Sequence, residues 1–428
     1  MAGIALLSCF FVLISIGVPI AYAMLGTAFF VLFVFEPGLP TIIVPQKFYG
    51  GADNYILLCI PFFMLAGELM GLTPLFDRLM KFSNAMVGHI RGGLSHVNIV
   101  VSMLFAGISG AASADTSAVG SMMIPAMVKQ GYTKSYATAV TVISSVIGVI
   151  IPPSGIMIVA ALATGTSVSS VFLGGVIPGI VAGSSLLIVS LIYGFTKGFP
   201  KSAEMNWRER GRAFWFGMPG LGIPIVIIGG ILGGLVTPTE AANLAVVYAI
   251  IVGALLIKGI PPLRELYQSL ITVVTRLSAI MICLGASMVL AWFFAIAGVP
   301  EIVAGAIMTV TDNPYGVMAL MLISYLIVGT FLDPLPAILI FSPIFQPIAS
   351  SFGISDVHFT VVMVMGLSIG LATPPVGSCI FVGSAISGLS VDKFVKDLLP
   401  FIAAMAAALV VVAFVPSLVE WLPKFAQS

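Results

Sequence analysis

Charged residues are scarce in this chain of 428 residues. Lysine and arginine number 17, aspartate and glutamate 16, and together they form 8% of the sequence, against about 25% in a typical soluble domain. Hydrophobic residues form 60% of the chain and the mean hydropathy is +1.19. This composition predicts an all-α polytopic membrane protein in a lipid bilayer. A net charge of +1, without a basic run, excludes nucleic acid as a partner.

Cysteine and histidine are also rare. The four cysteines lie in apolar segments without the spacing of a metal or redox site, which favours a packing role. None of the three histidines has a ligand partner three or four residues away. The chain also lacks a phosphate-binding loop and a nucleophile elbow, which argues against an ATP-driven pump. We therefore expect no cofactor, and no metal other than a coupling ion.

Long apolar runs dominate what is present. A bilayer core of about 30 Å needs about 20 apolar residues per helix. The first run is either one long helix or two short helices separated near Pro19. The predicted segments are 4–35, 55–70, 92–128, 132–166, 171–195, 214–235, 241–257, 277–297, 315–350, 357–389 and 400–422, with an amphipathic piece at 262–276.

The distribution of cations predicts how these segments are oriented. Five lysines and arginines lie in the loop 197–212, and the positive-inside rule assigns such a loop to the cytoplasm. Counting spans from this loop makes the segment 78–91, with three cations, cytoplasmic as well. The segment that carries Glu301 and Asp312 is then external. The two halves of the chain are therefore predicted to face opposite ways across the membrane.

The chain contains an internal repeat. "GVIIPPSGI" (148–156) returns 222 residues later as the double proline of "GLATPPVGS" (370–378), and the register holds from 131 to 178 without a gap. Upstream the offset is 218, which aligns Asp115 with Asp333. Combined with opposite orientation, this pattern predicts an inverted-topology repeat, which is typical of secondary transporters with alternating access and a site near the membrane midplane.

Each double proline is expected to break a membrane helix and expose carbonyl groups. Proline has no N–H, so Pro152 and Pro153 leave the carbonyls of Gly148 and Val149 without helical partners. An unpaired carbonyl in hydrocarbon costs several kcal/mol, and a sodium ion prefers such oxygen ligands. The following glycine is expected to let the chain turn and begin a half-helix aimed at an anion. The alternative is a proline kink that serves only packing.

Two aspartates mark the interruptions of the predicted hairpins. Asp115 and Asp333 lie in otherwise uncharged apolar stretches, where a carboxylate costs at least about 2.5 kcal/mol and indicates an ion or proton path. Each stretch is too short to cross twice, which favours a re-entrant hairpin over an ordinary surface turn. The residues predicted to bind sodium in these hairpins and helix breaks are Ser109, Asp115, Gly148, Val149, Ser154, Thr330, Asp333, Gly370, Thr373, Gly377 and Ser378.

Four stretches carry a resemblance to a known family. They are "GISGAASADTSAVGSMMIPAM" (107–127), "IIPPSGIMIVAALATGTSVSSVFLGGVIPGI" (150–180), "GGILGGLVTPTEAA" (229–242) and "GLATPPVGSCIFV" (370–382). Over essentially its whole length the chain resembles the large membrane subunit of tripartite ATP-independent periplasmic (TRAP) transporters, and it looks most like the sialic-acid branch.

The resemblance implies a sodium-coupled elevator transporter of the ion-transporter superfamily in the bacterial inner membrane. It would import an organic acid delivered by a periplasmic binding protein, with a small four-helix membrane subunit as a partner. The family's hairpin tips fall on 109–117 and 329–337, and its helix breaks on 148–155 and 370–378. The implied substrate-binding residues are Ser113, Thr116, Ser117, Pro153, Gly155, Pro336 and Pro375.

The repeat and the resemblance together divide the chain into four regions. Regions 1–91 and 196–313 are the scaffold helices and arm of the first and second repeats, and regions 92–195 and 314–428 are their transport regions. Three alternative functions stay open: a cation or proton antiporter with paired broken helices, a membrane-embedded enzyme and a channel. An enzyme would need a catalytic pair at one depth in the membrane, and only Asp115 and Asp333 could supply it. A channel would not depend on a binding protein, and we expect a transporter.

Overall fold

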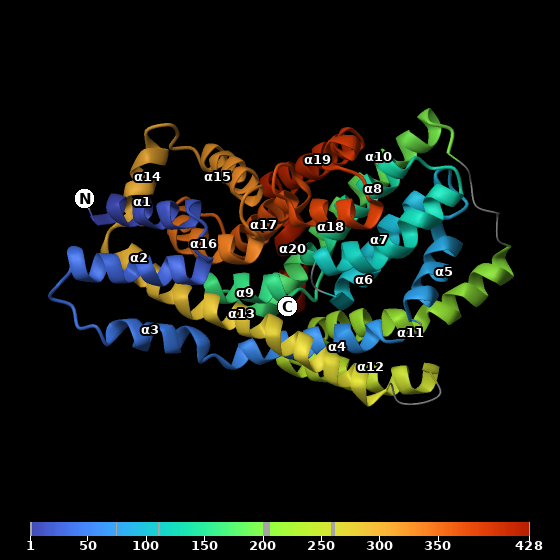
Figure 1. The fold of residues 1–428 in the computed structure, drawn as a ribbon, viewed down its shortest axis with the longest axis horizontal. Helices are drawn as coiled ribbons and strands as arrows, with labels where there is room; N and C mark the ends of the chain where they lie inside the picture. Colours follow the sequence, from blue (N-terminus) through green and yellow to red (C-terminus); the bar gives the residue numbers. More distant parts are fainter. Residues whose placement is uncertain (1, 74, 110–111, 200–205, 258–261, 428) are drawn as a thin grey trace.

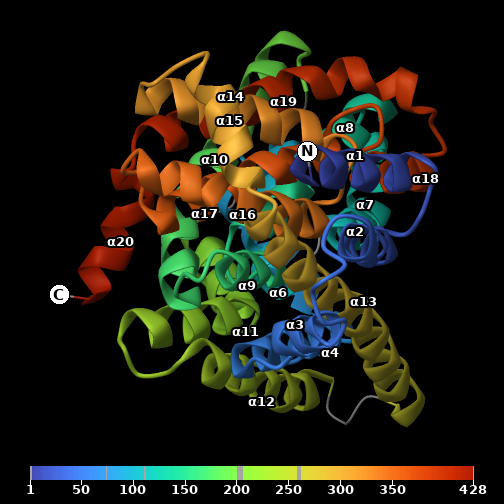
Figure 2. The ribbon, with the colours of Figure 1, turned by 90° about the vertical axis from the view of Figure 1, so that its left-hand side faces the viewer.

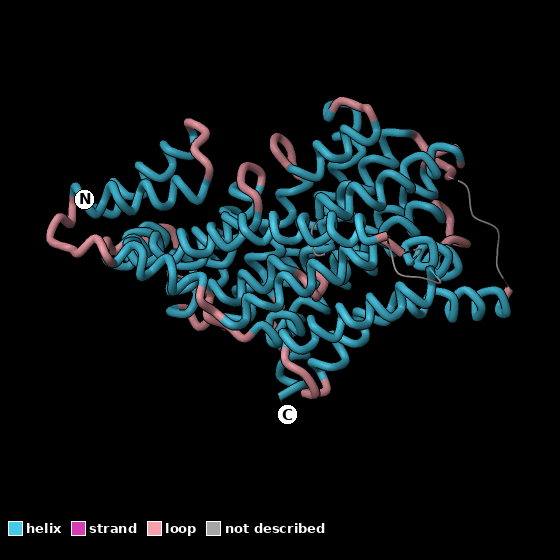
Figure 3. Tube along the Cα trace, turned by 60° about the horizontal axis from the view of Figure 1, so that its bottom comes forward, coloured by secondary structure: helices cyan, strands magenta, loops and turns pink. Residues whose placement is uncertain are grey.

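The computed structural model describes residues 2–73, 75–109, 112–199, 206–257 and 262–427, and every regular element within them is a helix. Short loops join these helices (Figure 3). The helices are α1 (Ala2–Ser15), α2 (Ile20–Val34), α3 (Ile43–Ala52), η1 (Tyr55–Leu58), α4 (Cys59–Gly71), α5 (Leu75–Val87), α6 (Gly93–Ser109), α7 (Ala112–Lys129), α8 (Lys134–Ile150), α9 (Gly155–Ala163), α10 (Val168–Thr196), α11 (Trp207–Leu232), α12 (Pro238–Ile257), α13 (Leu263–Ile296), α14 (Val299–Met308), α15 (Pro314–Gly329), α16 (Pro334–Ser351), α17 (Asp356–Ile369), η2 (Gly370–Ala372), α18 (Ser378–Ser387), α19 (Val391–Phe414) and α20 (Ser417–Gln427).

The helices have the length and composition of membrane spans. Among the described residues, six helices are long and apolar enough to cross a bilayer, or up to eight if each of two bent helix pairs is one span. The bent pairs are α3 with η1–α4, at 49°, and α8 with α9, at 46°. An all-helical chain satisfies its backbone polar groups internally, as hydrocarbon requires. The predicted all-α polytopic membrane protein is confirmed.

Several predicted segment limits change in the structure. The run 4–35 forms two short helices, and Pro19 immediately precedes the second. The pieces 262–276 and 277–297 are one continuous helix, α13, because nothing between them removes a backbone hydrogen bond. The predicted last segment, 400–422, is wrong at both ends. Its helix α19 begins at Val391 and ends at Phe414, and α20 follows.

Proline chemistry explains the break between α19 and α20. Pro416 has no N–H to donate to the carbonyl of Val412, four residues earlier. The imidazole of His358 on α17 takes its place, with Nε2 3.1 Å from the Val412 carbonyl oxygen. The backbone acceptor is thereby paired even though the helix is interrupted, as a buried carbonyl requires.

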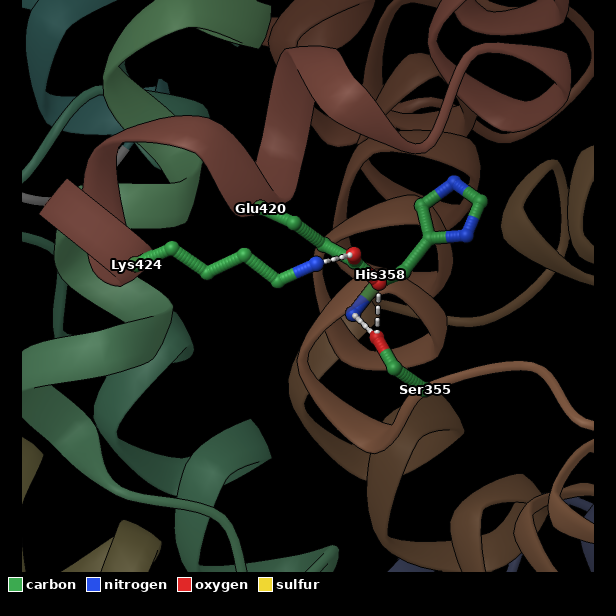
Figure 4. Close-up of polar contacts among 4 residues, drawn as sticks. All are labelled: Ser355, His358, Glu420 and Lys424. Atoms are coloured by element: carbon green, nitrogen blue, oxygen red, sulfur yellow. Dashed lines mark hydrogen bonds and ion pairs between the residues drawn. The ribbon is translucent and has the colours of Figure 1, made fainter.

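Hydrogen bonds to Glu420 fix the short C-terminal helix α20 against α17 (Figure 4). Ser355 donates its hydroxyl to Glu420 Oε1 at 2.5 Å and accepts the His358 N–H at 3.3 Å as the N-cap of α17. Lys424 Nζ lies 2.6 Å from Glu420 Oε2. Partial burial alone would raise the pKa of Glu420, but the bonds from Lys424 and Ser355 and the neighbouring positive charge lower that pKa on balance. The ionised carboxylate therefore stabilises this contact.

Apart from α14, which contacts α16 and α13, the helices fall into two groups, each drawn from both halves of the chain. In the first helix group, comprising α1–α5 and α11–α13, α12 packs on α4, α13 on α2 and α3, and α11 on α5. In the second helix group, comprising α6–α10 and α15–α20, α19 and α20 pack on α10, α18 on α7 and α8, and α16 on α9. Figures 1 and 2 show α3, α4, α11 and α12 on one side of the molecule and α15–α19 on the other.

Candidate transport site

Both double prolines lie in helix breaks. The chain leaves helical geometry between Ile150, the end of α8, and Gly155, the start of α9. In the second copy α17 ends at Ile369, a short 3₁₀ turn follows, and α18 begins at Ser378. The Pro–Pro peptide bond is cis in both copies. The breaks thus fall where the sequence predicts them.

The two breaks satisfy their backbone groups differently. Ser154 is the N-cap of α9, and its hydroxyl accepts the Met157 N–H at 3.4 Å. In the second break the Gly370 carbonyl accepts the Thr373 N–H at 2.9 Å, because η2 forms a tighter turn than an α-helix. A proline at 374 would by itself leave the Gly370 carbonyl without a helical partner, and the 3₁₀ turn supplies one instead. The second lone pair of that carbonyl stays available to a ligand.

The half-helices begin at the two predicted glycines, because α9 starts at Gly155 and Gly377 is the N-cap of α18. Neither glycine uses the left-handed region: Gly377 has a φ of −48°, and Gly155 has no positive φ. In the second break glycine permits close backbone approach. A Cβ on Gly377 would meet the backbone of Leu371, and one on Gly370 would overlap the backbone of Gly329 at the end of α15. At Gly155 the space is open.

The two repeat-related aspartates have different environments. Asp115 lies in the first turn of α7 with no exposed surface. Among the described residues neither carboxylate oxygen makes a hydrogen bond of good geometry, and the hydroxyls of Ser102 and Ser145 are the polar groups that interact with it. Asp333 is exposed and is the N-cap of α16, where Oδ1 accepts the Leu335 N–H at 3.4 Å. The helix α18, which follows the second break, packs against α7, the helix that carries Asp115.

A cavity of about 860 Å³ lies between the two helix groups. The first helix group contributes residues of α4 and α13, among them Phe63, Glu68 and Arg276. The second helix group contributes residues of α6, α7, α9 and α16 and of the two helix breaks. Six residues predicted for the site line the cavity: Ser113, Ser117, Pro153, Gly155, Asp333 and Ser378.

The other predicted residues whose side chains the structure describes are not among those that line this cavity. Thr116 donates its hydroxyl to the Ala112 carbonyl at 2.9 Å, Thr330 to Ile327 at 2.7 Å and Thr373 to Ile369 at 2.8 Å; each oxygen keeps lone pairs for a cation. The side chain of Ser109 lies outside the described residues. The remaining members of this set are Asp115, Gly148, Val149, Ser154, Pro336, Gly370, Pro375 and Gly377.

One ion pair in the cavity wall was not predicted from the sequence. Arg276 Nη1 on α13 lies 2.9 Å from Glu68 Oε1 on α4, and the two side chains are 47% and 29% exposed. Arg276 is the last residue of the amphipathic piece predicted at 262–276, and Glu68 lies near the end of the predicted segment 55–70. One signal was present: Arg276 is followed by no lysine or arginine until Lys393. A lone cation directly before a long apolar run needs a partner.

Known proteins are similar to this chain over almost its whole length. Residues 7–418 match the family described as "Tripartite ATP-independent periplasmic transporter, DctM component". An uncharacterized protein of Salmonella typhimurium, YgiK, is 40% identical, with 99% of this chain and 98% of that protein covered. The isethionate TRAP transporter permease protein DctMQ of Oleidesulfovibrio alaskensis is 33% identical, with 96% and 64% covered. The YdaH transporter of Alcanivorax borkumensis shares the fold, with a TM-score of 0.61, 12% identity and 86% of each chain covered.

Proposed function

Because this chain belongs to the DctM component family of tripartite ATP-independent periplasmic (TRAP) transporters, we propose that it is the large permease subunit of a sodium-coupled importer of an organic acid. The family consists of transporter permeases rather than enzymes, and the chain is a multi-pass protein of the bacterial inner membrane. The proposal concerns the coupling ion, the substrate and the motion.

The observation that carries this proposal is the cavity between the two helix groups. Its volume of about 860 Å³ lies in the range of small-molecule sites, and hairpin and break residues from both repeats line it. A site at the interface of repeats suits alternating access. We infer that the second helix group is the transport region that moves as an elevator against the first, which is the scaffold. We keep the boundaries predicted from the sequence at residues 91, 195 and 313, between scaffold and transport regions, as part of this proposal.

Sodium coupling is supported by the oxygen-rich surroundings of the helix breaks. A buried carboxylate with no cation beside it among the described residues, such as Asp115, is costly unless a cation neutralises it. Carbonyls of the broken helices and the nearby hydroxyls supply further oxygen ligands of the kind hard cations prefer. We therefore keep the eleven predicted sodium ligands as a proposal, with Asp115 and Asp333 as the charged members.

The partners and substrate follow from family membership. We infer a periplasmic binding protein that delivers the substrate and a small membrane subunit that completes the permease. The isethionate relative supports the second inference, because it is longer than this chain, which covers 64% of it. Sialic acid belongs to the organic acids that this proposal covers. An antiporter is disfavoured, because a cavity of this size exceeds what an ion or a proton needs.

Uptake into proteoliposomes tests the proposal. The permease is reconstituted with its small subunit and binding protein, and uptake of labelled isethionate, succinate and sialic acid is measured with and without an inward sodium gradient. We expect uptake of at least one acid that needs the gradient and both partners. Uptake that proceeds without sodium, or that is absent for all three acids, would contradict the proposal.

A further inference from the structure

The ion pair between Glu68 and Arg276 lies in the wall of the cavity, on the side of the first helix group. Arg276 is the only lysine, arginine or histidine among the described residues that line it. Two carboxylates, Glu68 and Asp333, line the same space. The cavity therefore carries one positive charge for two negative ones before any ligand enters.

An organic anion cannot enter this cavity without a counter-charge. A carboxylate or sulfonate that leaves water for a largely apolar space loses its hydration and needs a cation or hydrogen-bond donors in exchange. The planar guanidinium of arginine binds such groups with two parallel hydrogen bonds. Asp333 repels the anion unless a cation covers it. Among the described lining residues, only Arg276 supplies a fixed positive charge.

The partner that Arg276 has in this structure is replaceable. Both side chains of the ion pair keep exposed surface, at 47% and 29%, and an ion pair that water reaches is weak. The contact joins only one guanidinium nitrogen to one carboxylate oxygen, at 2.9 Å. An incoming acid group can therefore compete with Glu68 for the same donors at little cost.

We propose that Arg276 binds the acid group of the transported molecule and that Glu68 is its built-in competitor. The substrate displaces the Glu68 carboxylate from Arg276 when it enters, and Glu68 returns to Arg276 when the substrate leaves. This inference rests on the proposed import of an organic acid. Because the pair belongs to the first helix group, the return of Glu68 also releases the substrate from the part of the protein that we assign as scaffold.

The competing explanation is that the Glu68–Arg276 ion pair is a purely structural contact, here called a strut, which only holds α4 against α13. The two explanations differ in whether Arg276→Gln and Glu68→Gln change the KM in the same direction or in opposite directions. For a strut, neutralising either partner impairs the protein in the same way. For exchange, Arg276→Gln removes the counter-charge of the substrate, whereas Glu68→Gln removes its competitor.

Uptake kinetics in proteoliposomes separate these outcomes, with labelled isethionate, succinate and sialic acid as probes. We expect Arg276→Gln to raise the KM about tenfold or more and Glu68→Gln to lower it about threefold. The exposed pair Arg264→Gln and Glu265→Gln at the start of α13 are the matched charge controls. Equal changes of KM in the same direction for Arg276→Gln and Glu68→Gln would overturn the inference.

A variant with exchanged charges provides a second test of the inference. The double variant Glu68→Arg with Arg276→Glu can rebuild a strut between α4 and α13, but it moves the cation to α4. We expect its thermal stability to approach the wild type while its KM stays raised. Recovery of the wild-type KM would overturn the inference and leave the importer intact. Absence of wild-type uptake for all three acids would instead overturn the proposed function, and this inference with it.

Discussion

Gly370 packs against Gly329 so closely that a Cβ on Gly370 would overlap the Gly329 carbonyl group. Gly370 begins the turn of the second helix break, and Gly329 ends the first helix of the second hairpin. Two elements predicted to form the site are therefore in direct backbone contact. A displacement of one element moves the other.

This contact predicts that Gly370→Ala destabilises the protein. Overpacking a close contact typically costs about 1–3 kcal/mol, and here the neighbour is backbone that cannot rotate away. We expect a lower midpoint of thermal unfolding in detergent. Gly305→Ala on α14 is the control, because a Cβ there meets no atom within 4 Å and alanine favours a helix. A Gly370→Ala protein as stable as the control would contradict the packing argument.

The buried carboxylate of Asp115 predicts a sodium-dependent stability. Without sodium it is a buried charge with no cation beside it among the described residues, so Asp115→Ala should leave expression intact and remove most of the stabilisation that sodium gives over choline. Asp333→Ala should reduce the stimulation of uptake by sodium about tenfold or more. Asp115→Asn keeps the shape and serves as the matched variant. Unchanged sodium dependence in both alanine variants would show that the ion sites are elsewhere.

The contact between α20 and α17 predicts an acid-labile element. Since the pKa of Glu420 lies below its ordinary value of about 4.5, its ionised form contributes stability above that value, and the contribution is lost as the pH falls through the folded-state pKa. Glu420→Gln should therefore unfold at a lower temperature than the wild type at pH 7 but at a similar one in strong acid. The exposed Glu265→Gln is the control. A difference that persists unchanged in acid would contradict the assignment.

The inverted repeat predicts opposite faces for two loops. Single cysteines at Ser202 and Asn313 should react with an impermeant reagent from the cytoplasmic and the periplasmic side, respectively. Ser202 lies outside the described residues, and Asn313 caps α15. The background protein must lack the four native cysteines, Cys9, Cys59, Cys283 and Cys379. Labelling of both positions from the same side would remove the argument from inverted topology.

Local chemistry made some features predictable from the sequence. A missing N–H breaks a helix wherever two prolines stand, so both breaks fall at the predicted residues. Packing decided the rest. Asp115 and Asp333 align in sequence, yet one is sealed and the other faces a cavity, because different neighbours cover them. The Glu68–Arg276 pair joins residues 208 positions apart, and no local pattern specifies such a contact.

The broken helices are proposed to carry the transport, and a double variant in the second break tests this role. Replacing Pro374 and Pro375 with alanine restores two N–H donors, so the segment should become more regular and at least as stable. The carbonyls of Gly370 and Leu371 would then accept α-helical hydrogen bonds from the restored N–H groups, and the half-helix N-terminus at α18 would no longer face the cavity.

The decisive measurement is sodium-driven uptake per reconstituted molecule of this variant, with thermal stability recorded on the same preparation. We expect retained or increased stability together with loss of uptake. A mere packing kink predicts the opposite, with damaged folding and unchanged uptake per folded molecule. Sodium-driven uptake at the wild-type rate in the Pro374→Ala, Pro375→Ala protein would contradict the account.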